Sequence, residues 1–114
     1  MNIINLTPHA LNLVSPDGTN TTVPPSGMVA RVTATPGALE TTPGIPVPIA
    51  RPDTFGEVTD LPDPDPDTIY IVSAMVGARV SRSDVFTPGT GPSDNPIRNE
   101  KGQIVGVTRL KATA

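Results

Sequence analysis

The residues best suited to chemistry in this chain lie between positions 79 and 91. Arg79 and Arg82 are three residues apart, so on a helix they would share one face, and Asp84 could orient either guanidinium. The loop over residues 87–91 then offers hydroxyl groups and accessible backbone N–H groups. Arginine forks and exposed N–H groups are the donors that phosphate recognition uses. The pattern indicates an anion site, and an Arg82–Asp84 ion pair that only pins a loop is the alternative.

Four more residues belong to the candidate site. Thr90 lies in the small-residue loop, and Arg98 follows it in a basic C-terminal segment. His9 and Arg31 are candidate structural or ligand contacts. His9 follows Pro8 in a turn, where a structural hydrogen bond competes with a ligand contact as the role of the imidazole.

Most enzymatic and metal chemistry lacks its usual residues here. The chain has no cysteine, which excludes a disulfide, a thiolate nucleophile and a cysteine metal site. Its single histidine cannot form a histidine-based metal site, and the acidic segment 60–67 lacks the glycine that a calcium loop needs. No phosphate-binding glycine motif and no nucleophile elbow occur. We therefore expect a protein that is not an enzyme and uses no cofactor or metal, with a small hydrolase built on His9 as the remaining enzymatic alternative.

Charge divides the chain into two unequal parts. Residues 1–78 carry two arginines and eight carboxylates, a net charge of −6, whereas residues 79–114 carry six cations and three carboxylates, a net charge of +3. An anionic ligand would therefore bind the C-terminal third, although solvated surface charge explains the same asymmetry. The overall charge of −3 and the single aromatic residue near the basic segment, Phe86, argue against nucleic acid as a partner.

The element that must position these residues is the apolar run from Thr68 to Val72, which predicts a central strand buried on both faces. Ser73 is a candidate N-cap for a short helix over residues 74–81, which Gly77 weakens by about 1 kcal/mol relative to alanine. Alternating or β-branched segments predict further strands, and segments 35–53 and 60–67 read as proline-rich loops. The further strands are expected near residues 2–6, 10–14, 19–23, 28–34, 54–59, 84–88 and 104–110.

Composition completes the expected fold. Fifteen prolines and ten glycines in 114 residues, with 36% apolar residues, leave a thin core. We predict a mainly β protein: one small domain over residues 1–114, a β-barrel or sandwich-like sheet with long Pro/Gly-rich loops and at most one short helix. A core this thin favours a homo-oligomer or another partner.

Five blocks of the sequence resemble a family of small proteins found in bacteriophage and prophage genomes. The resemblance covers nearly the whole chain, although segment 35–53 is more elaborate here and Gly89 stands where an acidic residue is usual. It implies a phage context and supplies no activity. The blocks are Ile-Asn-Leu-Thr-Pro-His at 4–9, Pro-Ser-Gly at 25–27 followed by Val-Ala-Arg-Val at 29–32, Thr-Ile-Tyr-Ile-Val-Ser-Ala at 68–74, Arg82 with Asp84-Val85, and Gly-Gln-Ile-Val-Gly-Val at 102–107.

Within that context we expect a non-enzymatic phage accessory protein that acts by binding. One hypothesis is that it sequesters or blocks a host protein or an anionic nucleotide-type signal; the alternative is a virion structural component, such as a head decoration or tail accessory protein that assembles with other phage proteins. No apolar run approaches the ~20 residues that span a bilayer, and no basic-then-apolar segment opens the sequence. The expected location is the host bacterial cytoplasm, or the virion.

Overall fold

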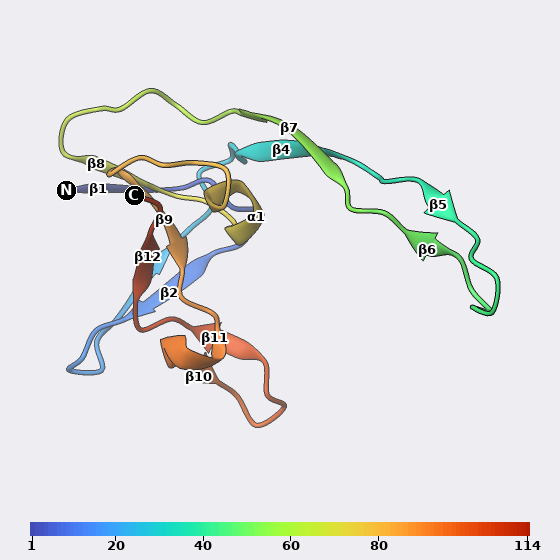
Figure 1. Ribbon diagram of the computed structural model, residues 1–114. Coiled ribbons are helices and arrows are strands. Elements are labelled where there is room, and N and C mark those ends of the chain that lie inside the picture. The colour runs from blue at the N-terminus through green and yellow to red at the C-terminus, as the bar shows by residue number, and fades with distance from the viewer.

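A computed structural model describes residues 1–114 and is built around one four-stranded sheet (Figure 1). β1 and β9 both run parallel to β8, which lies between them, and β12 pairs antiparallel with β9. The strands of this sheet, in spatial order, are β1 (Asn2–Asn5), β8 (Thr68–Ile71), β9 (Val85–Pro88) and β12 (Leu110–Ala112).

The core lies on this sheet and beneath the short helix α1 (Ala74–Gly77). β8 is central because its side chains are apolar on both faces, and Tyr70, Ile71 and the following Val72 are buried. Burial of each such side chain contributes roughly 1.5–3 kcal/mol. Only 16 of 114 residues are buried, so the core is small for the length of the chain. The main cluster is Leu6, Ala30, Tyr70, Val72, Val76 and Val85.

Four antiparallel strand pairs lie outside this sheet. The pair β2–β3 follows the Asp17-Gly18 turn, in which the Asp17 carboxylate accepts a hydrogen bond from the Thr19 N–H and Gly18 has a φ of +87°. Backbone bonds between Val14 and Val107 and between Val107 and Asn12 join β2 to the segment after β11. The pairs are β2 (Leu11–Val14) with β3 (Asn20–Val23), β4 (Arg31–Thr35) with β7 (Thr54–Thr59), β5 (Leu39–Glu40) with β6 (Ile49–Ala50), and β10 (Ile97–Arg98) with β11 (Ile104–Gly106).

Residues 31–59, here called the arm, form a two-stranded ribbon that projects from the rest of the protein, the head (Figure 1). β4 and β7 make its base, and β5 and β6 continue it outward. The projection explains a Cα radius of gyration of 17.3 Å, against about 13 Å for a compact chain of this length. At the junction of the two strand pairs, a side chain at Gly37 would overlap the backbone of Arg51, so only glycine lets the strands approach this closely.

The expected fold class is confirmed in its main features: the protein is a small, mainly β domain with one short α-helix. The barrel alternative is wrong, because the sheets do not close on themselves and β1 and β12 remain at the two ends of the main sheet. The structure contains no helix with the length and apolar character needed to cross a membrane.

Three predicted boundaries differ from the structure. The helix expected over 74–81 ends at Gly77, because the following N–H groups of Arg79 and Val80 bond three residues back and form turns instead of helix. The segment 35–53, read as a loop, contains β5 and β6. The single strand expected over 104–110 is divided between β11 and β12, which belong to different sheets. The acidic segment 60–67 contains no strand, as expected.

Candidate functional site

A buried polar network shapes the turn that follows β1. The Asn5 side chain, 1% exposed, donates to the carbonyl oxygens of His9 (2.7 Å) and Val23 (3.1 Å). Its Oδ1 accepts from the backbone N–H of Thr7 (2.9 Å), and the Thr7 hydroxyl lies 2.6 Å away. Asn5 thus meets the needs of several buried backbone groups at once. The sequence marked this motif, but it did not reveal that Asn5 and Thr7, and not His9, are its buried members.

His9 is held at the surface by this network through its carbonyl group, while its side chain borders an apolar cavity of about 390 Å³. The same cavity is bordered by Ser73 and by Thr90. The fold therefore brings together two of the predicted site residues, His9 and Thr90. Ser73 caps α1 by accepting from the Val76 N–H at 3.5 Å. The Ser73 hydroxyl is therefore engaged with the first turn of the helix as its N-cap.

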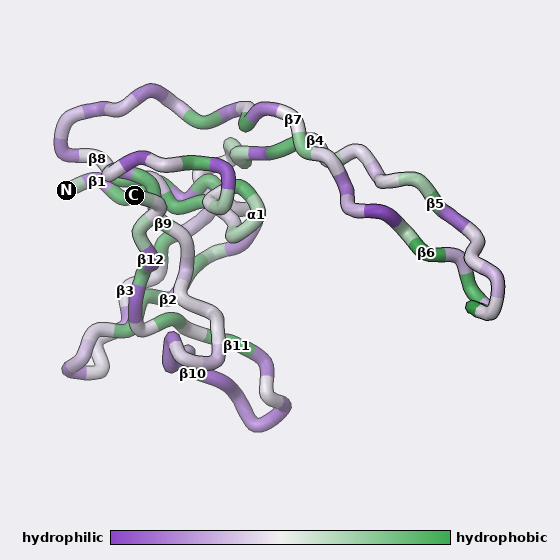
Figure 2. Tube along the Cα trace, viewed as in Figure 1, coloured by the Kyte–Doolittle hydropathy of each residue, from purple (hydrophilic) through white to green (hydrophobic).

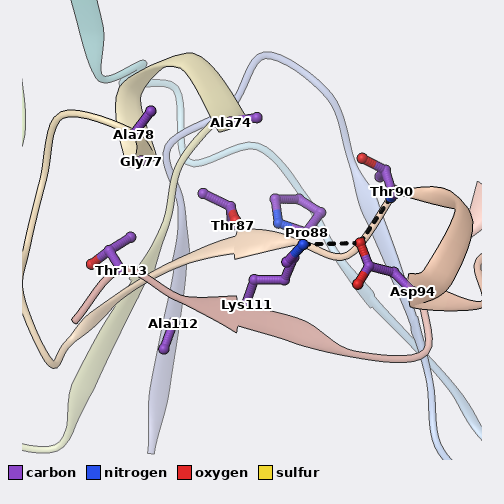
Figure 3. A pocket seen from close by; sticks show the side chains of 11 residues that line it. Ala74, Gly77, Ala78, Thr87, Pro88, Thr90, Asp94, Lys111, Ala112 and Thr113 are labelled. Atoms are coloured by element: carbon purple, nitrogen blue, oxygen red, sulfur yellow. Dashed lines mark hydrogen bonds and ion pairs between the residues drawn. The ribbon is translucent and has the colours of Figure 1, made fainter.

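A second cavity of about 390 Å³ lies between α1, β9 and β12 and shares Thr90 with the first (Figure 3). Gly77 allows α1 and β9 to approach closely beside this cavity, because a side chain at that position would overlap the methyl group of Thr87. Small and hydroxyl-bearing residues make most of its wall, and Lys111 is its only cation. The lining residues are Ala74, Gly77, Ala78, Thr87, Pro88, Thr90, Gly91, Asp94, Lys111, Ala112 and Thr113.

The two charged groups of this second cavity form an ion pair. The buried Asp94 carboxylate accepts from the Gly91 N–H at 2.8 Å and from Lys111 Nζ at 3.3 Å (Figure 3). The Gly91 hydrogen bond, followed by Lys111, lowers the pKa of Asp94 below its usual value. Because the carboxylate offsets the ammonium charge, this cavity lacks the net positive charge that an anion site needs.

Arg82 and Asp84 form a bidentate ion pair in a partly buried position. Arg82 Nε and Nη2 donate to the two Asp84 oxygens at 3.0 and 2.7 Å, and Nη1 donates to the Pro62 carbonyl oxygen at 3.0 Å. Tyr70 supports the same loop by donating to the Asp63 carbonyl oxygen at 3.2 Å. Each of the three nitrogens of the Arg82 guanidinium thus donates to a group within the chain, and these bonds tie the acidic loop to the main sheet.

The other candidate cations have separate surroundings. The Arg79 guanidinium lies 3.4 Å from the centre of the Phe55 ring and donates to the Met75 carbonyl oxygen at 3.1 Å, so it joins α1 to the base of the arm. Arg98 donates to the Gly102 carbonyl oxygen at 2.8 Å inside its own hairpin. Arg31 borders a third cavity, of about 320 Å³, at the start of the arm.

The predicted ligand set is therefore not assembled in one place. Arg79, Arg82 and Arg98 lie on three different parts of the head, and none of them borders a cavity described above. Of the predicted anion-site residues, only Thr90 does. No group of three or more histidine, aspartate or glutamate side chains lies close enough together to hold a metal ion.

Lowered carboxylate pKa values predict a loss of stability in acid. The Arg82 hydrogen bonds lower the pKa of Asp84, and the Gly91 hydrogen bond lowers that of Asp94. A carboxylate whose pKa is lower in the folded state stabilises the protein above its unfolded-state pKa, about 4, and this contribution is lost as the pH falls through the folded-state value. Urea unfolding should therefore show a falling midpoint below about pH 4. Asp84→Asn should flatten this fall, because it removes one of the carboxylates whose pKa is lowered in the folded state.

Four of the ten large apolar side chains that are exposed lie on the arm. Leu39 is 71% exposed and Val47 62% exposed, and Ile45 lies beside the turn between them. Figure 2 shows hydrophobic segments along the outer part of the arm, far from the core. The only ion pair along the arm, Glu40 with Arg51, is itself half exposed. The outer arm is therefore an uncovered surface with mixed apolar and charged character.

The protein thus consists of a head, which contains two cavities that share Thr90, and a projecting arm. No protein-family model, curated protein or solved structure matches this chain.

Proposed function

We propose that this protein acts by binding, without catalysis, and that it serves as a structural component of an assembly through its arm. In the phage context that the sequence resemblance implies, the assembly is the virion. The observation that carries the proposal is the arm itself: a two-stranded ribbon that leaves the core and bears exposed Leu39, Ile45 and Val47.

A projecting two-stranded ribbon of this kind is unusual in a monomeric protein. A two-stranded hairpin without a covering layer is marginally stable in water. Its few anchors are at the base, where Arg79 lies over Phe55, while the outer pair β5–β6 is held by local contacts such as Arg51 with Glu40. Coverage by a partner would bury the apolar side chains and stabilise the ribbon, which is what an assembly contact supplies.

The version of the binding hypothesis based on an anionic signal has weaker support. The cations proposed for it, Arg79, Arg82 and Arg98, each donate to an acceptor within the chain and do not converge. Lys111 at the second cavity is neutralised by Asp94. A nucleotide would have to displace these bonds before it gained any contact of its own.

The experiment is quantitative mass spectrometry of purified particles of the phage that encodes the protein. We expect a fixed, multi-copy amount of the chain in each particle. A phage that carries Leu39→Asp with Val47→Asp should lose the protein from its particles, because charged side chains would oppose burial of the arm.

The control is Met28→Asp, which places an aspartate on an exposed apolar residue outside the arm and should keep the protein in the particle. Particles that lack the wild-type chain would refute the structural role. Particles that retain the arm variant at the wild-type amount would refute the role of the arm.

A further inference from the structure

A second uncovered apolar surface lies on the head, on the β10–β11 hairpin. Ile97, Ile104 and Val105 are 38–45% exposed and share this hairpin with Arg98 and Lys101, which are also exposed. We call these five residues the C-terminal patch. Like the outer arm, the hairpin is a two-stranded sheet, so β10 has an outer edge whose backbone groups pair with no other strand.

The arm and the C-terminal patch have opposite charge. The arm, residues 31–59, carries three carboxylates and two arginines, a net charge of −1. The β10–β11 hairpin, residues 97–106, carries two cations and one carboxylate, a net charge of +1. Each surface therefore combines exposed branched aliphatic side chains with a charge that complements the other, as partner surfaces do.

These two surfaces cannot meet within one molecule as it is folded. Figure 1 shows the outer arm, around β5 and β6, directed away from the head, and the β10–β11 hairpin well separated from it. Gly37 packs against the backbone of Arg51, which fixes how the outer arm continues from its base. Two complementary surfaces that face apart on one chain are suited to contact between copies.

We propose that the arm of one copy docks on the C-terminal patch of a second copy. Leu39, Ile45 and Val47 would cover Ile97, Ile104 and Val105, and a strand of the outer arm would pair with the free edge of β10. This inference rests on the proposed role of the arm as a binding element, and it adds the identity of the partner. Strand addition supplies affinity through backbone bonds, while the side chains and charges select the register.

Such a contact joins two different surfaces, so a pair of copies keeps one free arm, on one copy, and one free patch, on the other. A head-to-tail contact of this kind closes into a ring or continues as a filament, depending on the rotation between copies. The assembly should also weaken as salt is raised, because the charges at both surfaces are exposed.

The test is sedimentation velocity of the purified full chain over a range of concentrations and salt. The wild-type chain should form species larger than the 11.8 kDa monomer at low salt. The arm variant Leu39→Asp/Val47→Asp and the patch variant Arg98→Glu/Lys101→Glu should each sediment as monomers. Both variants alter exposed side chains, and circular dichroism should confirm that they retain the wild-type fold.

Mixing the two variants provides the decisive measurement. The arm variant keeps an intact patch, and the patch variant keeps an intact arm, so an equimolar mixture retains one functional contact per pair. We expect a dimer of twice the chain mass and nothing larger, because the second contact of each pair is defective. The control Met28→Asp, at an exposed residue outside both surfaces, should assemble as the wild type does.

A wild-type chain that stays monomeric at the highest soluble concentration in low salt would overturn the inference. So would variants that assemble unchanged, or a mixture that yields no dimer. These outcomes are distinct from failure of the proposed function, because incorporation into particles is measured separately and would persist if the arm contacts a different virion protein.

Discussion

Asn5→Asp should destabilise the protein by about 3–5 kcal/mol, the range found when a buried charge is left without compensation. Aspartate has the shape of asparagine, but it cannot donate to the carbonyl oxygens of His9 and Val23. It would instead place a buried carboxylate against two acceptors. Urea unfolding at neutral pH measures the loss as a lower midpoint, with the slope giving the area exposed.

The pH dependence of this variant separates buried charge from general damage. Burial raises the pKa of a carboxyl group in the folded state, so the charged form is penalised above that pKa and the protonated form below it is tolerated better. The difference in the free energy of unfolding between Asn5→Asp and the wild type should therefore become smaller as the pH falls. Asn2→Asp, an exposed change in the same strand, should shift stability by less than about 0.5 kcal/mol. Equal effects at the two positions would contradict the role assigned to Asn5.

Arg82→Lys should lower stability by about 2 kcal/mol although the charge is retained. The guanidinium donates through three nitrogens, two to Asp84 and one to the Pro62 carbonyl oxygen. An ammonium group cannot reproduce this planar fork. Hydrogen bonds to charged groups contribute roughly 1.5–3 kcal/mol each, and partial exposure reduces that figure here. The acidic loop should loosen at the same time, which faster amide exchange at Tyr70 and its neighbours would report.

Arg79→Lys is the matched control, since Arg79 is exposed and an ammonium can still lie over the Phe55 ring. We expect a change below about 1 kcal/mol. If Arg82→Lys were as stable as the wild type, the structural role of the Arg82–Asp84 pair would be wrong, and the pair would again be available for a ligand.

The sequence predicted the parts of the fold that depend on local pattern. The apolar run after Asp67 identified β8, and the β-branched or alternating segments 10–14 and 19–23 identified β2 and β3. The arm was not predicted, because β4 and β7 pair across a segment rich in proline, which locally indicates a loop. Pairing over such distances depends on contacts that no short window of sequence contains.

The prediction of an anion site failed for a related reason. Arg79 and Arg82 share one helical face only if the helix reaches residue 82, and it ends at Gly77. Arg82 instead forms an ion pair with Asp84, as the alternative interpretation of Arg82 and Asp84 predicted. The buried role of Asn5 was invisible because a short polar side chain beside a turn is usually exposed, and only the packing of β3 and Leu6 around it excludes water.

The parallel pairing of β1 with β8 has a consequence for how the chain reaches this fold. Asn2 lies opposite Thr68, so β1 has no partner strand until β8, far along the sequence, has been made. Contacts between such distant residues slow folding, because a long loop must close before they form. The arm lies within that loop and pairs mostly with itself, so it can form early and bring Ala30 near the start of the acidic loop. β1 is then among the last strands to be locked in place.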